Sequence, residues 1–208
     1  MTISLNNTGK RYNREWIFRH CSYTFISGKS YAITGPNGSG KSTLLQVIAG
    51  ATLHNEGTIE YRATDNGQQT TDEQQHYKSI SIAAPYLELI EEMTAKEILE
   101  FHSKFKPLIQ SLSIEEMLKI VGLENAANKQ IRYFSSGMKQ RLKLAQAFFS
   151  NTPVLLLDEP TTNLDADGIT LYQTLISNYT KDKLVIVSSN VKEEYDFCEE
   201  VIKIGNYK

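Results

Sequence analysis

The chain has 208 residues, of which 40% are hydrophobic and 22% are charged, and this composition indicates one globular domain. The formal net charge of −2 at pH 7 gives no general attraction to nucleic acid or anionic lipid, so no nucleic-acid partner is expected. Cys21 and Cys198 lie far apart without metal-binding spacing, which indicates reduced thiols in the cytosol, and no apolar run approaches the roughly 18 residues that span a bilayer.

The N-terminal part predicts two strands on the edge of the fold. Residues 3–5 alternate in polarity and form the first strand, residues 6–9 (Asn-Asn-Thr-Gly) mark a turn, and residues 17–26 form the second strand. Tyr12 lies between the strands, next to Lys10 and Arg11. Its ring could stack on an adenine base, or it could be a half-exposed tyrosine of an antiparallel strand.

A glycine-rich loop follows a short apolar strand at residues 30–34 and leads into a helix from Lys41 to Ala49. Its sequence fits the phosphate-binding pattern of Gly, four residues, Gly-Lys and Ser or Thr. The nine residues are Gly35, Pro36, Asn37, Gly38, Ser39, Gly40, Lys41, Ser42 and Thr43. Backbone N–H groups of such a loop and the positive end of the helix dipole attract phosphate.

The loop therefore predicts a nucleotide site. Lys41 would reach the β- and γ-phosphates of ATP, and the Ser42 hydroxyl would bind Mg²⁺. The alternative is a glycine-rich turn between strand and helix that binds nothing.

Residues 57–61 predict another strand, and the polar residues 62–78, with Asn66-Gly67, predict an exposed loop or the tip of a long hairpin. A further strand at residues 79–84 ends before Pro85.

Residues 86–130 predict a helical subdomain. Capping boxes at Thr94 and Ser113 open two helices, the first ending near Pro107 and the second near Gly122. The aromatic side chains of this subdomain are expected in its core rather than at a ligand site.

Residues 134–138 (Phe-Ser-Ser-Gly-Met) precede a helix at 139–149. The aliphatic run at 154–157 then predicts a strand buried on both faces, as in a parallel sheet. Asp158 and Glu159 follow its carboxyl end, where ligands of open α/β sheets bind. Asp158 can bind Mg²⁺, and Glu159 can accept a proton from a water that attacks the γ-phosphate, although an Asp-Glu pair can also cap a downstream helix.

The remaining chain continues the β-α-β pattern. A helix is expected at 168–179, a buried strand at 184–187, a helix at 191–197 and a last strand at 201–204. The fold class is therefore α/β: a phosphate-loop NTPase with a mostly parallel core sheet, an antiparallel β subdomain and a helical subdomain. We expect a single domain over residues 1–208, without a transmembrane or regulatory domain.

These motifs together resemble the ATP-binding subunits of ABC (ATP-binding cassette) transporters. Residues 35–43 look like the family's phosphate loop, and residues 155–159 like its magnesium and catalytic strand. Residues 134–140 are similar to its signature motif, in which Ser135 and Gly137 match while Ser136 and Met138 differ. Asn163-Leu164-Asp165 resembles the D-loop, and Tyr12 falls where the family stacks adenine.

The resemblance implies an ATPase that works as a dimer. Two cassettes pair head to tail, and Ser135, Ser136, Gly137 and Asp165 of one chain meet the ATP bound by the other. It also implies separately encoded membrane-spanning permease subunits, docked by residues 86–130, and a place on the cytoplasmic face of the membrane. The signature is similar to that of some exporters.

Two positions depart from the family. Pro85 stands where a glutamine usually contacts magnesium and water, and Ser189 stands at the position of the switch histidine, where its hydroxyl would act on the γ-phosphate. Asn190 or a partner chain could substitute. Hydrolysis is then expected to be slow, because loss of one positioning donor costs about 10² to 10³ in rate.

Three other functions stay open at the level of the sequence. One is an ATP-dependent dimerisation switch with little hydrolysis. Another is an ABC protein of DNA repair or translation, which usually carries a long coiled coil or two cassettes. The last is a kinase or other phosphate-loop enzyme, for which no acceptor site or lid is evident.

Overall fold

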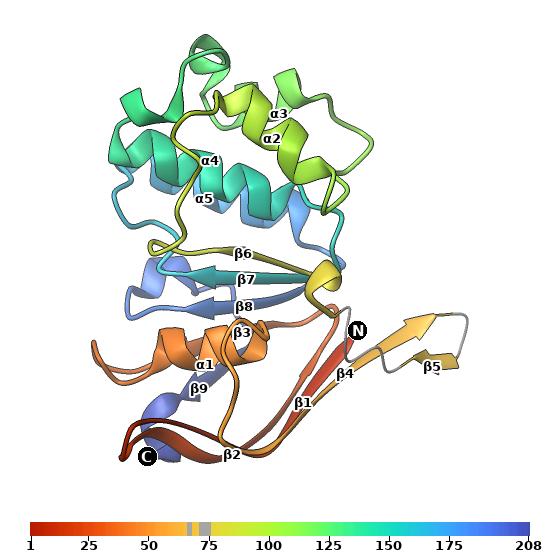
Figure 1. Ribbon diagram of the computed structural model, residues 1–208, viewed down its shortest axis with the longest axis vertical. Helices are drawn as coiled ribbons and strands as arrows, with labels where there is room; N and C mark the ends of the chain where they lie inside the picture. The colour runs from red at the N-terminus through yellow and green to blue at the C-terminus, as the bar shows by residue number, and fades with distance from the viewer. Residues whose placement is uncertain (66–67, 71–75) are drawn as a thin grey trace.

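The computed structural model describes residues 1–65, 68–70 and 76–208, with backbone only for 63–65 and 68–70. Its centre is a five-stranded sheet in the order β6-β7-β8-β3-β9, in which every neighbouring pair is parallel (Figure 1). The strands are β3 (Ser30–Thr34), β6 (Ile80–Ala83), β7 (Val154–Asp158), β8 (Leu184–Ser188) and β9 (Glu200–Lys203). The expected parallel core sheet is confirmed.

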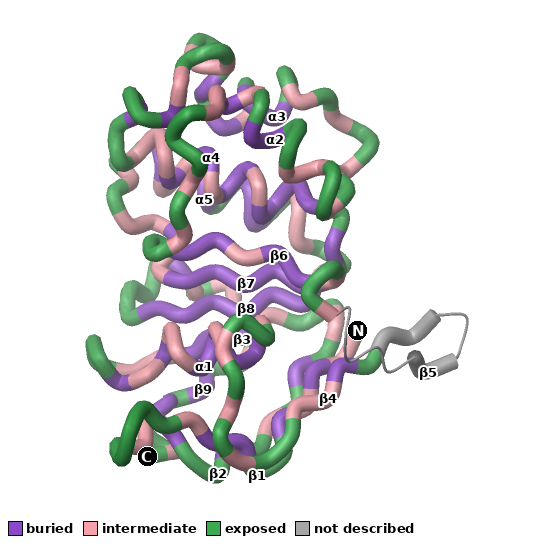
Figure 2. Tube along the Cα trace, viewed as in Figure 1, coloured by how far each residue is buried: buried purple, intermediate pink, exposed green. Residues whose placement is uncertain are grey.

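The parallel sheet separates two hydrophobic cores, because successive side chains of a strand point to opposite faces. On β7, Leu155 and Leu157 pack into the core beneath α4 (Ser136–Phe148) and α5 (Ala166–Tyr179). Val154 and Leu156 pack into the other core, with α1 (Lys41–Ile48) and the antiparallel strands. Every residue of β7 and of β8 is buried (Figure 2), as the aliphatic run predicted for β7.

A second, antiparallel sheet has the order β2-β1-β4-β5. Its strands are β1 (Thr2–Tyr12), β2 (Glu15–Ile26), β4 (Glu56–Asp65) and β5 (Gln68–Thr70). The predicted turn at residues 6–9 is wrong, since β1 runs through it, and β1 is an interior strand rather than an edge strand.

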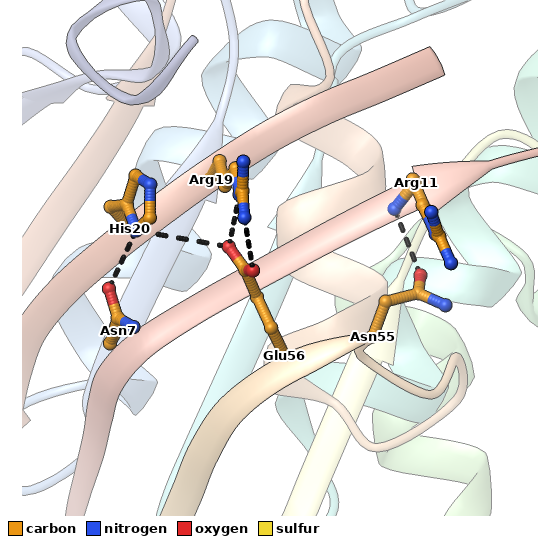
Figure 3. Close-up of polar contacts among 6 residues, drawn as sticks. All are labelled: Asn7, Arg11, Arg19, His20, Asn55 and Glu56. Atoms are coloured by element: carbon orange, nitrogen blue, oxygen red, sulfur yellow. Dashed lines mark hydrogen bonds and ion pairs between the residues drawn. The ribbon is translucent and has the colours of Figure 1, made fainter. Parts of the chain in front are cut away.

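The residues predicted as a turn form a bulge in β1 instead. Asn7 has a positive φ of 49°, and the register with β2 shifts between Leu5 and Thr8. Figure 3 shows the side chains around the bulge: Asn7 Oδ1 lies 2.8 Å from His20 Nδ1, and Glu56 accepts two hydrogen bonds from Arg19. These cross-strand contacts let the strand continue through a sequence that favours turns.

The polar stretch predicted as a loop or hairpin tip begins as a hairpin. β4 extends to Asp65, and Ala63 pairs with Thr70 of β5. Asn66-Gly67 and residues 71–75 lie outside the described residues.

Both predicted capping boxes of the helical subdomain are present, at Thr94 before α2 (Ala95–Ser103) and at Ser113 before α3 (Ile114–Ile120). The expectation that its aromatic side chains are core is wrong for all three. Tyr86, Phe101 and Phe105 are 43%, 38% and 62% exposed, and the two phenylalanines contact each other edge to face.

Two helices differ from the prediction. α4 begins at Ser136, inside the signature-like motif, because Ser135 caps it. The helix predicted at 191–197 is wrong: only a single 3₁₀ turn, Lys192–Glu194, is present. Among the described residues, no helix has the length and apolarity to span a membrane.

Candidate active site

The phosphate loop connects β3 to α1 at the carboxyl edge of the parallel sheet. Gly38 and Gly40 have φ values of 74° and 102°, a region that favours glycine. A Cβ on Gly40 would lie 2.4 Å from Cγ2 of Ile17, so the close approach of β2 also requires glycine there. The loop therefore keeps the shape that exposes its backbone N–H groups.

Lys41 is 4% exposed, and its Nζ donates to the carbonyl oxygens of Gly35 (2.9 Å) and Pro36 (3.4 Å). Ser39, in the same loop, has a buried hydroxyl without a partner among the described residues. A cavity of about 210 Å³ opens beside the loop. It is lined by Ile17, Asn37, Gly38, Gly40, Lys41, Ser42, Thr43 and Glu159. The structure thus brings Lys41, Ser42 and Glu159 to one cavity.

Asp158 ends β7 and Glu159 follows it, and the two carboxylates differ in their surroundings. Asp158 is 1% exposed, and burial raises the pKa of its carboxyl, while the nearby Ser188 and Ser42 hydroxyls oppose the rise. Its Oδ1 has no hydrogen-bond partner in the described chain. Glu159 is held with a positive φ of 42°, and its N–H donates to Ser188 O (2.9 Å).

This arrangement fits a magnesium ion. A buried carboxylate oxygen without a donor is stabilised by a cation, and Ser42 supplies a hydroxyl oxygen beside it. Mg²⁺ typically uses one or two protein oxygens together with phosphate oxygens and water. The described residues contain no cluster of three His, Cys, Asp or Glu that could hold a metal.

After β8, the side chain that reaches the phosphate loop is Asn190 and not Ser189. Ser189 is fully buried, and its Oγ accepts from the N–H of Val191 (2.9 Å). Asn190 accepts from the N–H of Gly35 (3.3 Å) and donates to Asn37 Oδ1 (2.9 Å). The turn after β8 uses the Ser189 hydroxyl locally.

Pro85 offers no side-chain hydrogen-bonding group, and its carbonyl oxygen accepts from Lys143 Nζ (2.8 Å). Its neighbour Tyr86, which sequence reasoning missed, lies between Gln46 and Asp158. Burial and the Asp158 carboxylate raise the pKa of Tyr86 to about 12, against a hydrogen bond with Gln46. The Tyr86 hydroxyl therefore stays protonated near the Asp158 carboxylate.

The signature-like residues form a different cavity of about 490 Å³. It is lined by Gly122, Leu123, Ser135, Ser136, Gly137, Met138, Arg141, Asn163, Leu164 and Asp165. Ser135 Oγ accepts from Met138 N–H (3.2 Å), and Asp165 caps α5 and contacts Arg141 (3.2 Å). None of these residues lines the phosphate cavity, so one chain does not bring the two motifs together.

Tyr12 ends β1 and is 48% exposed, with Lys10 Nζ 4.8 Å from its ring centre. It does not line the phosphate cavity, although Ile17 of the next strand does. Its exposed ring leaves both sequence interpretations open.

Comparison with known proteins gives one consistent family. A family model described as ABC transporter matches residues 18–162. The Bacillus subtilis protein YybJ, named as an uncharacterized ABC transporter ATP-binding protein, is 33% identical over 98% of this chain and 93% of its own length. The cytochrome c biogenesis ATP-binding export protein CcmA of Rhizobium etli is 31% identical over 91% of this chain and 88% of its own.

A solved structure is similar over nearly the whole fold. It shows the ATP-binding cassette MJ0796 as a dimer in a post-hydrolysis state, bound to ADP and Pi. It has a TM-score of 0.79 and 26% identity, and the match covers 97% of this chain and 93% of that one.

Proposed function

Since the chain belongs to the ABC transporter family, as an ATP-binding subunit with ATPase activity, we propose that it drives a transporter by hydrolysing ATP between two paired cassettes. The observation that carries this proposal is the separation of the phosphate cavity from the signature-like cavity. A second cassette, docked head to tail, would place Ser135 and Gly137 of one chain at the nucleotide of the other. The dimeric state of MJ0796 supports such a pairing.

The site residues have different roles in ATP binding and hydrolysis. Loop N–H groups and Lys41 bind the phosphates, Ser42 and Asp158 hold Mg²⁺, and Glu159 accepts the proton of the attacking water. When bound, Mg²⁺ neutralises charge on the phosphate oxygens. Asn190 holds the phosphate loop through Gly35 and Asn37, which supports a role at the switch position in place of the Ser189 that the alignment suggested.

Hydrolysis is expected to be slow rather than absent. Pro85 supplies no side-chain donor, and Asn190 carries no charge where the family has a histidine. Glu159 lines the phosphate cavity, which favours hydrolysis over a switch that only binds ATP.

The test is ATP hydrolysis by the purified chain with Mg²⁺, compared with Glu159→Gln. We expect kcat to fall by about 10² to 10³ in the variant, with ATP binding retained and the dimer stabilised in sedimentation. Glu100→Gln, at an exposed carboxylate on α2, is the matched control. If Glu159→Gln hydrolyses ATP at the wild-type rate, the assignment of the base fails.

The partners are proposed to be membrane-spanning permease subunits on the cytoplasmic side of a membrane, docked by residues 86–130. A groove between the start of this subdomain and α4 supports docking there. It is lined by Pro85, Leu87, Glu88, Leu89, Glu91, Lys139 and Lys143. Export is the proposed direction, supported by the signature form and by the printed name of CcmA. Affinity purification from cells tests this: a polytopic membrane protein should co-purify, whereas ribosomes or nucleic acid would favour the other class of ABC protein.

A further inference from the structure

The loop from Glu159 to Asn163 is held from two sides by buried side chains. Gln140 of α4 is 2% exposed, and its Nε2 donates to Pro160 O (2.8 Å). Glu194 is also 2% exposed, and its Oε1 accepts from both the N–H (2.8 Å) and the hydroxyl of Thr161. Glu194, four residues after Asn190, thus reaches the loop that begins at Glu159, the proposed catalytic carboxylate.

The conformation of this loop needs such support. Glu159 and Asn163, at its two ends, have φ values of 42° and 66°. Non-glycine residues adopt this region at a cost in free energy, so the surrounding contacts must hold them there. Gln140 and Glu194 supply hydrogen bonds to Pro160 and Thr161, two of the three residues between these ends.

The backbone of Glu194 is held by a contact outside the loop. Tyr172 of α5 donates its hydroxyl to Glu194 O (2.6 Å), and the segment forms a single 3₁₀ turn there. A buried carboxylate is stable only when hydrogen-bonded, so Thr161 and Glu194 constrain each other.

Residues 188–194 contact both the phosphate loop and the loop from Glu159 to Asn163. Ser188 O and Glu194 Oε1 accept from the N–H groups of Glu159 and Thr161, while Asn190 between them bonds the phosphate loop. A displacement of the phosphate loop would therefore be transmitted to the catalytic loop through a segment of seven residues.

We propose that Glu194 is a positioning residue, which with Gln140 fixes the Glu159 carboxylate for hydrolysis and couples it to the phosphate loop. Glu194 does not line the phosphate cavity, so in this role it acts through Thr161. The inference rests on the proposed function of Glu159 as the base.

The test compares Glu194→Ala and Glu194→Gln with the exposed neighbour Glu193→Ala as the matched control. Loss of the acceptor should lower kcat by about 10- to 100-fold, because misplacing a catalytic group by 1 Å can cost about 10² in rate. The affinity for a fluorescent ATP analogue should stay within about twofold. Glu194→Gln keeps an acceptor oxygen and should recover most of kcat.

Thr161→Val tests the same contact without removing a buried carboxylate, and should lower kcat in the same direction but less. Equal losses of kcat and analogue affinity, or wild-type kcat in Glu194→Ala, overturn the inference. Glu159→Gln is measured alongside. An inactive Glu159→Gln with an active Glu194→Ala rejects only the positioning role, whereas an active Glu159→Gln rejects the base itself.

Discussion

The two edges of the parallel sheet both bury polar side chains, but those side chains are hydrogen-bonded very differently. At the amino edge, Lys183 Nζ donates to the carbonyl oxygens of Phe148 (3.2 Å) and Ser150 (2.7 Å). Ser150 Oγ in turn contacts His102 Nε2 (2.8 Å) and Gln146 O (2.6 Å). Every buried polar atom in this group has a partner.

The carboxyl edge also contains buried polar atoms without a partner. Within the described residues, the buried side-chain atoms that lack a partner are Ser39 Oγ, Asp158 Oδ1, Ser188 Oγ and Glu194 Oε2. They lie in the phosphate loop, at the last residues of β7 and β8, or in the segment that follows β8. Buried polar groups are normally hydrogen-bonded. We infer that the unpartnered groups at the carboxyl edge lower the free energy of unfolding and are available to a ligand, whereas the hydrogen-bonded groups at the amino edge stabilise the fold.

The largest expected effect is at Asp158. Asp158→Asn should lower ATP hydrolysis by at least about 10², because the carboxylate proposed for Mg²⁺ is lost. The same change should raise the stability of the nucleotide-free protein by roughly 0.5–2 kcal/mol, because burial disfavours the charged form, as its raised pKa indicates. Steady-state kinetics and urea unfolding measure the two effects.

Asp182→Asn, at an exposed position, is the control for this pair of effects. A variant that loses both activity and stability would contradict the division between the two edges.

The next effect is a pH dependence at the amino edge. Burial lowers the pKa of Lys183 to about 8 from 10.5. Between these values the unfolded state binds a proton that the folded state does not, so rising pH favours folding. Relative to Lys183→Met, the wild type should gain up to about 3 kcal/mol from pH 8 to 10.5, measured by urea unfolding.

Lys181→Met, at an exposed lysine close by, should keep the wild-type slope. ATP hydrolysis at pH 7.5 should be unchanged within about twofold in a Lys183→Met sample that is folded. A parallel pH course in the wild type and Lys183→Met would show that Lys183 is not the group responsible.

The smallest effect is expected for Ser150→Ala. Removing the hydroxyl leaves Gln146 O and the His102 ring without this partner, which should cost about 1–2 kcal/mol. In a protein of this size that lowers the unfolding temperature by about 2–8 °C, while kcat stays at the wild-type value. Ser177→Ala, an exposed hydroxyl that bonds Gln173 O (3.0 Å), should change neither quantity. A loss of kcat in Ser150→Ala would mean that the amino edge also serves the site.

Local sequence signals predicted the elements that they encode directly. The glycine spacing located the phosphate loop, the two capping boxes located the starts of α2 and α3, and the aliphatic run located β7. Where the signal was ambiguous the prediction failed. Asn and Gly at residues 6–9 favour a turn, but pairing with β2 and β4 on both sides made them a bulge.

The sequence by itself determined the phosphate loop, the carboxylates after β7 and the α/β order of strands and helices, because each follows from side chains adjacent in the chain. Only the tertiary structure decided that Asn190 rather than Ser189 meets the phosphate loop, that Tyr86 lies near Asp158, and that Glu194 turns inward to Thr161. These contacts join segments far apart in the chain. No local pattern encodes them, since they depend on how neighbouring strands end and on which polar groups are left to be satisfied.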